Sequence, residues 1–203
     1  MKLLRAILVV GLAVVLGLSI LGCSKGSGKV LKVGADCTYP PMEFQDEKTK
    51  EFVGVDIDII KAIVKEMGRK AEIVNVGWDG VIPGLLNGNY DVLISAMTIT
   101  DERAAQINFS DPYLPSGQVI LVQASNESIK VPADLKGKAV AVQMGTTGDF
   151  AVTKMEGVTV KRFNANPEAV QELRNGGADA VVADSTTLLY EAEIGRASCR
   201  ERV

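Results

Sequence analysis

Residues that could bind a small charged molecule follow several predicted strands. The segment SAMTITDER at residues 95–103 ends one such strand, and Thr100 is placed to cap a helical turn that carries Arg103. A guanidinium beside freed backbone N–H groups can clamp a carboxylate. From spacing alone, however, an ordinary exposed helix arginine is the favoured interpretation.

A second segment, QMGTTG at residues 143–148, lies between a predicted strand and a predicted helix. Its glycines allow the backbone to approach a ligand, and its N–H groups would point at an anion. A plain tight turn explains the same residues equally well.

Further candidates stand at the ends of other strands. Asp184 directly precedes Ser185, where its carboxylate could hold an ammonium group or could simply cap the next helix. Asp36, Tyr39 and Trp78 each follow a predicted strand, and such aromatics could sandwich an aliphatic or cationic side chain. Buried aromatic residues are more often part of the core.

Composition excludes several kinds of chemistry. The 203 residues include no histidine, which rules out Ser-His-Asp and Cys-His catalysis and histidine-containing zinc sites. The sequence has no Walker A motif, no Gly-x-Gly-x-x-Gly after a strand and no Gly-x-Ser-x-Gly. We therefore expect no catalytic residues, no cofactor and no metal. Cys37 lacks a histidine partner and is expected to be a small packing residue.

The charge balance argues against nucleic-acid binding. The chain carries 22 basic and 25 acidic residues, for a net charge of −3, and 47% of its residues are apolar. The terminal segments hold a share of the charge: Lys2, Arg5, Arg196, Arg200, Glu201 and Arg202. Without them 17 basic and 24 acidic residues remain, which gives −7 for the middle. Phosphate binding needs a concentrated basic face, so we expect no nucleic-acid partner.

Periodicity then predicts the elements that position these residues. The first half is expected to contain strands at 31–36, 71–76 and 91–97, helices at 56–67 and 81–87, and a hairpin over 42–54. The second half is expected to contain strands at 139–144, 159–164 and 178–184, and helices at 149–155, 166–175 and 185–191. Two successive βαβαβ units imply two lobes, each with a mostly parallel sheet. The extended apolar segment 118–124 joins them as a hinge, and ligands bind at the carboxyl ends of such strands.

The N-terminus has the features of a secretory signal peptide over residues 1–22. Lys2 and Arg5 precede an apolar run over 6–18, and the ending Ile-Leu-Gly-Cys resembles a bacterial lipobox in which Cys23 is lipid-modified. Residues 23–29 then form a flexible tether. The alternative is a transmembrane anchor, because residues 6–22 are at the short end of a spanning helix. Both interpretations put the rest of the chain outside the cytoplasm.

The C-terminus breaks abruptly from the acidic segment before it. Residues 193–203 resemble the translation of a short-read sequencing adapter, and a natural arginine-rich tail is the alternative. We expect the natural chain to continue past Ala192.

Several segments together resemble the bacterial extracellular solute-binding proteins of the polar amino-acid family, the capture subunits of ABC importers. The resemblance covers residues 31–192 and rests on YPPMEF at 39–44, GVDIDI at 54–59, WDG at 78–80, TITDER at 98–103 and FSDPY at 109–113. It implies an α/β, two-lobed type II periplasmic-binding-protein-like fold. Residues 30–117 would form lobe 1, and residues 118–192 the hinge strand and an incomplete lobe 2. Because the segments that return to lobe 1 in this family are missing, residues 30–192 alone are expected to be poorly stable.

The resemblance also implies roles at matching positions. Arg103 would bind the α-carboxylate of an L-amino acid, helped by Thr98 and by the N–H of Thr147. Asp184 and the carbonyl of Ala96 would hold the α-ammonium, although many members have a serine in place of Ala96. The side-chain pocket would be lined by Asp36, Tyr39, Trp78 and Gln143. Glu43 and Asp56 are expected to be structural and are left out of the site.

Asp36 between two aromatic rings favours a basic ligand such as arginine or lysine, with glutamine second because Gln143 suits an amide. The implied partners are this small-molecule ligand, the permease subunits of an ABC importer and, through Cys23, the membrane; the protein itself would be a monomer. Two alternatives stay open. One is a secreted dehydratase acting on cyclohexadienyl acids with Glu43 as its acid, and the other is the sensory domain of a receptor.

Overall fold

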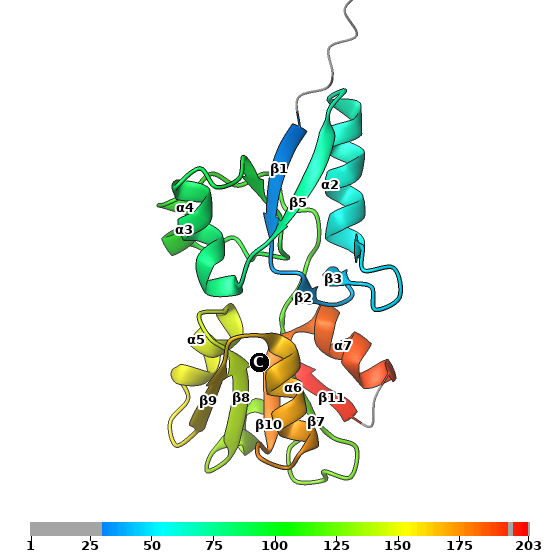
Figure 1. The fold of residues 1–203 in the computed structure, drawn as a ribbon. Coiled ribbons are helices and arrows are strands. Elements are labelled where there is room, and N and C mark those ends of the chain that lie inside the picture. The colour runs from blue at the N-terminus through cyan, green and yellow to red at the C-terminus, as the bar shows by residue number, and fades with distance from the viewer. Residues whose placement is uncertain (1–29, 195–196, 203) are drawn as a thin grey trace, which may run out of the picture.

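The structure is a computed structural model that describes residues 30–194 and 197–202. The predicted signal peptide, the tether and Cys23 lie outside these residues. The elements gather in two lobes stacked end to end, with β1 to α4 in the first and β7 to β11 in the second (Figure 1). Within the described residues, no helix is both long enough and apolar enough to cross a bilayer.

The first lobe is built on a three-stranded parallel sheet. β1 (Val30–Ala35) lies between β5 (Lys70–Asn75) and β6 (Val92–Leu93). Helix α2 (Val55–Glu66) packs Ile60 and Val64 against Val33 of the central strand. The strand predicted over 91–97 is shorter than expected, because the Ala96 N–H bonds to Asp56 rather than to a neighbouring strand.

Short elements at the lower end of this lobe carry the residues that face the second lobe. The predicted hairpin is present as an antiparallel sheet of β2 (Thr38–Tyr39), β3 (Glu43–Gln45) and β4 (Phe52–Val53). A 3-10 turn over Trp78–Gly80 leads into α3 (Val81–Leu86), and α4 (Asp101–Ala104) follows β6.

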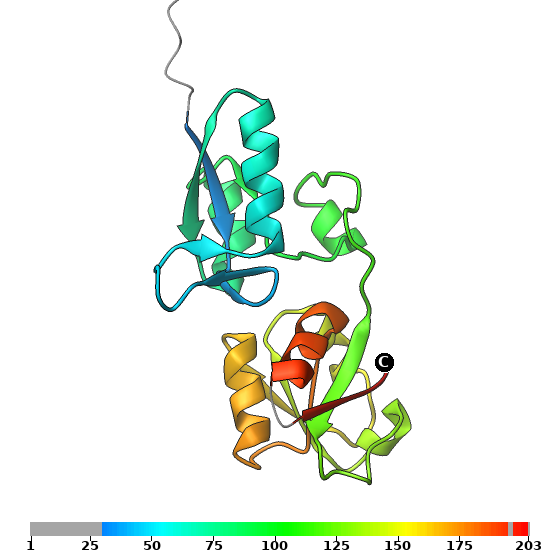
Figure 2. The same ribbon diagram turned by 90° about the vertical axis from the view of Figure 1, so that its right-hand side faces the viewer.

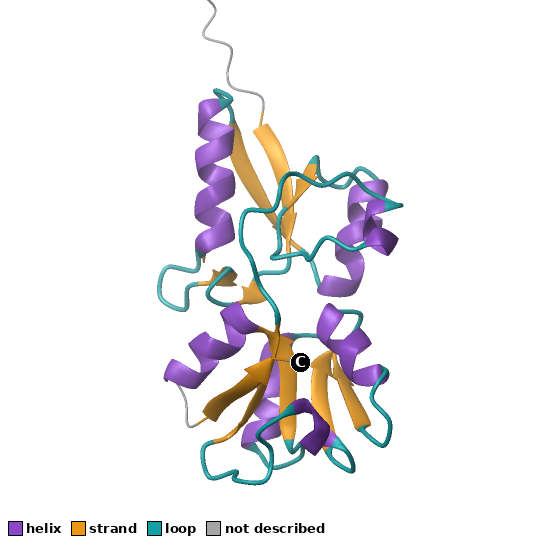
Figure 3. Cartoon of the chain, turned by 180° about the vertical axis from the view of Figure 1, so that it is seen from behind, coloured by secondary structure: helices purple, strands orange, loops and turns teal. Residues whose placement is uncertain are grey.

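The second lobe is a five-stranded sheet in the order β11-β7-β10-β8-β9. Its strands are β7 (Gln118–Gln123), β8 (Ala139–Gln143), β9 (Thr159–Phe163), β10 (Ala180–Asp184) and β11 (Ala197–Arg202). β7 alone runs against its neighbours, so the sheet is mostly parallel as expected. Its helices are the 3-10 turn Pro132–Leu135, α5 (Thr147–Thr153), α6 (Asn166–Arg174) and α7 (Ser185–Ile194), and they cover both faces (Figure 3).

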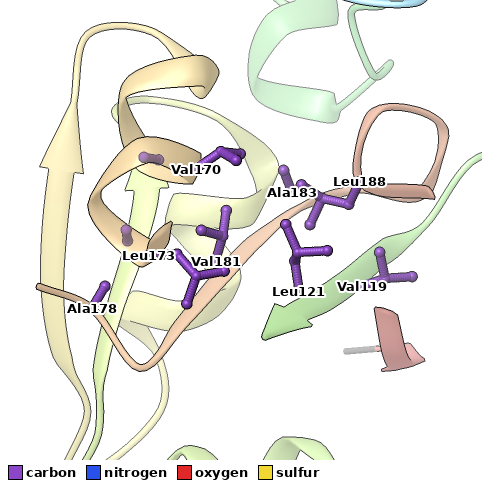
Figure 4. Packing of buried hydrophobic residues seen from close by; sticks show 10 residues of the cluster. Val119, Leu121, Val170, Leu173, Ala178, Val181, Ala183 and Leu188 are labelled. Carbon is purple, nitrogen blue, oxygen red and sulfur yellow. The ribbon is translucent and has the colours of Figure 1, made fainter. Parts of the chain in front are cut away.

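The core of the second lobe lies on both faces of this sheet. On one face α6 and α7 bring Leu173 and Leu188 against Leu121 and Val181 (Figure 4). On the other face Val152 of α5 joins a second fully buried apolar cluster. Strands apolar on both sides are what a sheet covered by two helical layers requires.

The segment predicted as the inter-lobe connection lies elsewhere than expected. Residues 118–123 form β7 inside the second sheet, where Ile120 and Leu121 are fully buried. The chain passes between the lobes in the irregular residues 105–117 (Figure 2). The apolar run favours burial between two helical layers over a position at a solvated joint. Residues 197–202 pair with the outer side of β7 through backbone groups, which any extended segment can supply.

Candidate functional site

A pocket lined by residues of both lobes lies where the two lobes meet. Its wall contains every residue assigned to a ligand site from the sequence: Asp36, Tyr39, Trp78, Ala96, Thr98, Arg103, Gln143, Thr147 and Asp184. Glu43, Ser95 and Thr146 complete the lining. Residues separated by more than one hundred positions in the sequence are thus brought together at one place.

Arg103 is not the exposed helix arginine that spacing alone favoured. Thr100 caps α4, because its Oγ1 accepts a hydrogen bond from the Arg103 N–H at 3.3 Å. The Arg103 side chain then turns inward and is only 7% exposed. Its Nη1 donates to the Thr98 carbonyl at 2.8 Å, and its guanidinium carbon lies 5.2 Å from the centre of the Trp78 ring. Burial lowers the pKa of Arg103, but an arginine remains cationic.

The turn before α5 reaches across to the first lobe. The Gly145 carbonyl accepts from the Trp78 indole N–H at 3.3 Å and from Arg103 Nη2 at 3.4 Å. Gly145 has a φ of 72°, a conformation that favours glycine. Thr146 caps α5, and Thr147 is the first residue of that helix, so the Thr147 N–H has no partner within it.

Asp184 at the end of β10 provides a carboxylate between the lobes. Its Oδ2 accepts from the Tyr39 hydroxyl at 2.9 Å, and its Oδ1 accepts from Gln118 Nε2 at 2.6 Å. Burial raises the pKa of Asp184, while these donors and the nearby Arg103 charge lower it. A carboxylate held by two neutral donors beside the pocket can accept further hydrogen bonds from a cation.

Asp36 provides a second carboxylate and is 3% exposed. Its Oδ1 accepts from Thr38 Oγ1 at 2.7 Å, and its Oδ2 accepts from Gln143 Nε2 at 3.0 Å across the lobes. Burial raises the pKa of Asp36, and these hydrogen bonds lower it. Gln143 also donates to the Asn164 carbonyl at 3.1 Å, which fixes the orientation of its amide.

Sequence reasoning missed several residues of this site. Ser95 directly precedes Ala96 in a segment already singled out, whereas Glu43 was considered and left out as structural although it lines the pocket. Gln118 lies behind the pocket, where its Nε2 reaches both Asp184 and Thr147 Oγ1. A polar residue at the start of an otherwise apolar strand was the signal that could have identified Gln118.

A contact outside the pocket also joins the lobes. Thr187 in α7 is fully buried, and its hydroxyl donates to the Pro40 carbonyl at 2.7 Å. Tyr39, next to Pro40, donates to Asp184 in the other lobe. The two lobes are therefore held together by polar contacts at neighbouring residues at the end of β2.

A metal site and a reactive thiol each require a particular arrangement of side chains among the described residues. Over residues 30–194, no three His, Cys, Asp or Glu side chains are grouped to hold a metal ion. Cys37 is buried, and burial raises the pKa of its thiol to about 12. A thiol held protonated in this way is a poor nucleophile.

Comparison with known proteins agrees with this geometry. The family model described as "Bacterial extracellular solute-binding proteins, family 3" matches residues 31–191. The chain belongs to this family. The expected family and the expected two-lobed α/β fold are thereby confirmed, and the family is one of extracytoplasmic proteins.

Relatives of family 3 include proteins named for amino acids. The "Probable histidine-binding protein" of Neisseria gonorrhoeae is 38% identical, over 79% of this chain and 61% of its own length. The "L-cystine-binding protein TcyJ" of Escherichia coli (strain K12) is 37% identical, over 78% of this chain and 60% of its own length. The chain thus spans about three fifths of these relatives.

Solved structures of family members superpose closely. An ancestral arginine-binding protein bound to arginine has a TM-score of 0.83 at 43% identity, covering 87% of this chain and 80% of that one. The arginine-bound form of truncated ArgBP from T. maritima has a TM-score of 0.82 at 43% identity, covering 88% and 85%. An ancestral arginine-binding protein bound to glutamine has a TM-score of 0.81 at 45% identity, covering 86% and 79%.

Proposed function

We propose that this chain binds a polar L-amino acid between its two lobes and delivers it to the permease of an ABC importer. The observation that carries the proposal is the charge pattern of the pocket. One buried guanidinium, Arg103, shares the pocket with the buried carboxylate of Asp36 and the half-buried carboxylate of Asp184. A zwitterion with a second cationic group has the complementary pattern.

The α-carboxylate of the ligand would bind at Arg103. The guanidinium is fixed by the Thr98 carbonyl and the Trp78 ring, so less side-chain entropy is lost when it binds an anion. The Thr98 side chain and the Thr147 N–H supply the neighbouring donors. Charge-assisted hydrogen bonds of this kind are about twice as strong as neutral ones.

The α-ammonium would bind between Asp184 and the Ala96 carbonyl. Ala96 has a φ of 46°, and its N–H is held by Asp56 Oδ2 at 2.7 Å. Because Asp184 belongs to the second lobe and Ala96 to the first, an ammonium that contacts both would stabilise the closed arrangement. Only such differential contact can shift the equilibrium between open and closed lobes.

The ligand side chain would extend toward Asp36. The partners of this carboxylate are the neutral donors Thr38 and Gln143, and Trp78 and Tyr39 line the same pocket. This surrounding favours a cationic end, as in arginine or lysine, while the Gln143 amide makes glutamine the second choice. The names of related proteins support both: an arginine-binding protein of Escherichia coli is 34% identical, and one structural neighbour holds glutamine.

We further propose that the protein binds its ligand without converting it. The relatives described above are named as binding proteins, and a neighbour at 42% identity is an ancestral amino-acid-binding protein described as a precursor of cyclohexadienyl dehydratase.

The remaining predictions are part of the same proposal: a monomer, lobes over 30–117 and 118–192, and a lipid anchor at Cys23. Labelling of the wild type but not of Cys23→Ser with a radioactive fatty acid would test the anchor.

Titration with individual L-amino acids tests the ligand. Trp78 is the only tryptophan and lies in the pocket wall, so its fluorescence should change on binding. We expect saturation with arginine or lysine at micromolar or lower concentration, about −8 kcal/mol or stronger, and recovery of the ligand unchanged. Saturation with glutamine alone would overturn the assignment of Asp36. Calorimetry over the same panel checks the result without a fluorophore, and no binding of any L-amino acid by both methods contradicts the proposal.

A further inference from the structure

Two buried carboxyl groups support the pocket wall: Glu43 lines it, and Asp56 bonds to the Ala96 N–H in it. Glu43 in β3 and Asp56 in the first turn of α2 are both fully buried. None of the ion pairs found among the described residues includes either of them. Two carboxylates buried together without a cation destabilise each other, so one of them tends to keep its proton.

A count of hydrogen-bond donors leads to the same conclusion. Glu43 Oε1 accepts from Ser95 Oγ at 2.8 Å, and Asp56 Oδ2 accepts from the Ala96 N–H at 2.7 Å and from the Tyr113 hydroxyl at 2.9 Å. The other two carboxyl oxygens, Glu43 Oε2 and Asp56 Oδ1, are buried and accept no hydrogen bond from a hydroxyl or N–H group of the described residues. A buried oxygen without a partner costs about 1–3 kcal/mol, and one shared proton would supply both oxygens.

The surroundings of the two carboxyl groups indicate which of them carries the shared proton. Burial raises the pKa of Glu43 well above its usual range, and the charge of Asp56 raises it further. Burial also raises the pKa of Asp56, but hydrogen bonds from Ala96, Tyr113 and Glu43 lower it. The other titratable groups that act on Glu43 or are acted on by it are acidic: Asp36, Cys37, Tyr39 and Tyr113.

We propose that Glu43 is protonated at neutral pH, donates its proton in a hydrogen bond to Asp56, and so positions Ser95 and Ala96 at the pocket wall. Glu43 is linked to Asp36 through Ser95, whose Oγ donates to Glu43 Oε1 and accepts from the Asp36 N–H at 3.0 Å. Glu43 is linked to Ala96 through Asp56, which accepts from the Ala96 N–H. Ala96 has a left-handed backbone conformation, which is costly for a residue with a Cβ. Glu43 is thus a positioning residue. The proposal goes beyond the proposed function, because the proton is held whichever ligand binds.

Infrared spectroscopy can detect the proton directly. At neutral pH the wild type should show the carbonyl stretch of a protonated carboxylic acid, and Glu43→Gln should lack it. Glu47→Gln is the matched control, since Glu47 is exposed in the neighbouring turn and should leave the band unchanged. A wild-type spectrum without this band, or a band that persists in Glu43→Gln, overturns the proposal.

The pH dependence of folding gives an independent readout. Folded Glu43 keeps its proton through neutral pH, whereas in the unfolded chain it ionises near its ordinary pKa. Unfolding therefore releases one proton between these two pKa values, and stability falls as pH rises through that window. Within that window the release of one proton raises the unfolding constant by about tenfold for each pH unit. A variant without the Glu43 carboxyl group should lack this contribution. Glu43→Gln should show this loss and Glu47→Gln should not; equal slopes in all three proteins contradict the inference.

Amide hydrogen exchange tests the positioning itself. In Glu43→Gln the amide can still donate to Asp56, so exchange at Asp36 and Ala96 should match the wild type. In Glu43→Leu no donor remains, and these two amides should exchange at least about tenfold faster than in the wild type. Unchanged protection in Glu43→Leu would show that Glu43 does not hold Ser95 and Ala96 in place.

Discussion

At the residue scale, the side chains that carry charge into the pocket differ from ordinary surface charges by their burial. Arg103 is 7% exposed and makes its contacts with backbone carbonyls and the Trp78 ring. None of the described ion pairs includes Arg103. Its positive charge is therefore available to an anionic ligand.

Arg103→Ala should weaken ligand binding by about thirtyfold or more. Truncating one partner of a buried charge pair costs about 2 kcal/mol at least, because the other charge is left without a partner. Calorimetric titration with the preferred amino acid measures the effect. Arg69→Ala is the control, since Arg69 is exposed in the turn between α2 and β5, and it should bind as the wild type does. An Arg103→Ala affinity within threefold of wild type would remove Arg103 from the binding site.

The charge on Asp36 should make arginine binding depend on pH. Burial raises the pKa of Asp36, so its carboxylate is protonated at a higher pH than an ordinary aspartate. Since only the ionised form pairs with a guanidinium, affinity for arginine should be full above this pKa and fall as pH drops through it. Asp36→Asn should bind arginine more weakly and with a smaller pH dependence, because burial also raises the pKa of Asp184 and that carboxylate still titrates, while its affinity for glutamine should change little. The control Asp58→Asn, exposed on α2, should keep the wild-type profile.

The residue types of the site were predictable from sequence, but their burial was not. Thr100, Arg103 and Asp184 stand at element ends, where local spacing shows what a side chain can do. Local spacing does not show which lobe faces them. The contacts of Tyr39 with Asp184 and of Gln143 with Asp36 span more than one hundred residues, and only the tertiary fold brings these pairs together.

At the element scale, α5 lies against β10 so closely that only glycine fits at one position. A Cβ on Gly148 would come within 2.8 Å of the Val182 carbonyl oxygen and 2.9 Å of Gln118 Oε1. Real Cβ atoms do not approach backbone this closely, so α5 would have to move. The same movement would displace Thr147 and the turn that reaches Arg103.

Gly148→Ala should therefore lower the stability of the second lobe by about 1–3 kcal/mol, as overpacking does, and should weaken ligand binding as well. Gly88→Ala is the control that distinguishes a steric clash from backbone strain. A Cβ at Gly88 meets nothing within 4 Å, but the φ of 72° is unfavourable for alanine. This substitution should cost only about 1–2 kcal/mol through that backbone conformation and leave binding unchanged. Chemical denaturation and ligand titration measure both effects. A Gly148→Ala protein with wild-type stability would mean that α5 can shift freely.

Periodicity predicted most elements of the fold to within a few residues, and its errors have physical causes. The strand expected over 91–97 shortens to Val92–Leu93, because Ser95 and Ala96 are drawn toward Glu43 and Asp56. The apolar residues of α2 are not all buried: Ile60 and Val64 pack against the sheet, whereas Ile63 is 49% exposed. A pattern of apolar residues shows which face can be buried, not how much of it a small sheet covers.

At the scale of the whole molecule, the two lobes meet through hydrogen bonds that are distributed over the interface. Some of these involve residues that would contact a ligand, such as Tyr39 with Asp184. The bond from Thr187 to the Pro40 carbonyl belongs to neither the pocket wall nor the connecting segment. It can therefore report on closure separately from ligand contact.

Thr187→Val should reduce ligand affinity without removing any ligand contact. The variant keeps the shape of the side chain but leaves the Pro40 carbonyl without its donor when the lobes close, whereas water can replace that donor when they open. A hydrogen bond of this kind contributes about 1 kcal/mol, so affinity should fall about fivefold. The loss should appear as a larger open population, since a change confined to the closed state lowers apparent affinity through the fraction that is competent to bind.

Small-angle scattering of the protein without and with saturating ligand distinguishes this from a direct effect on the pocket. Thr187→Val should be more extended than wild type before ligand is added and equally compact at saturation. Thr159→Val, at an exposed position on β9, should match the wild type in both measurements. Equal affinity in Thr187→Val and wild type would mean that closure is governed by the pocket residues and the ligand alone. A lower affinity with unchanged scattering would instead assign Thr187 a role within the second lobe, through its contact with Asn166.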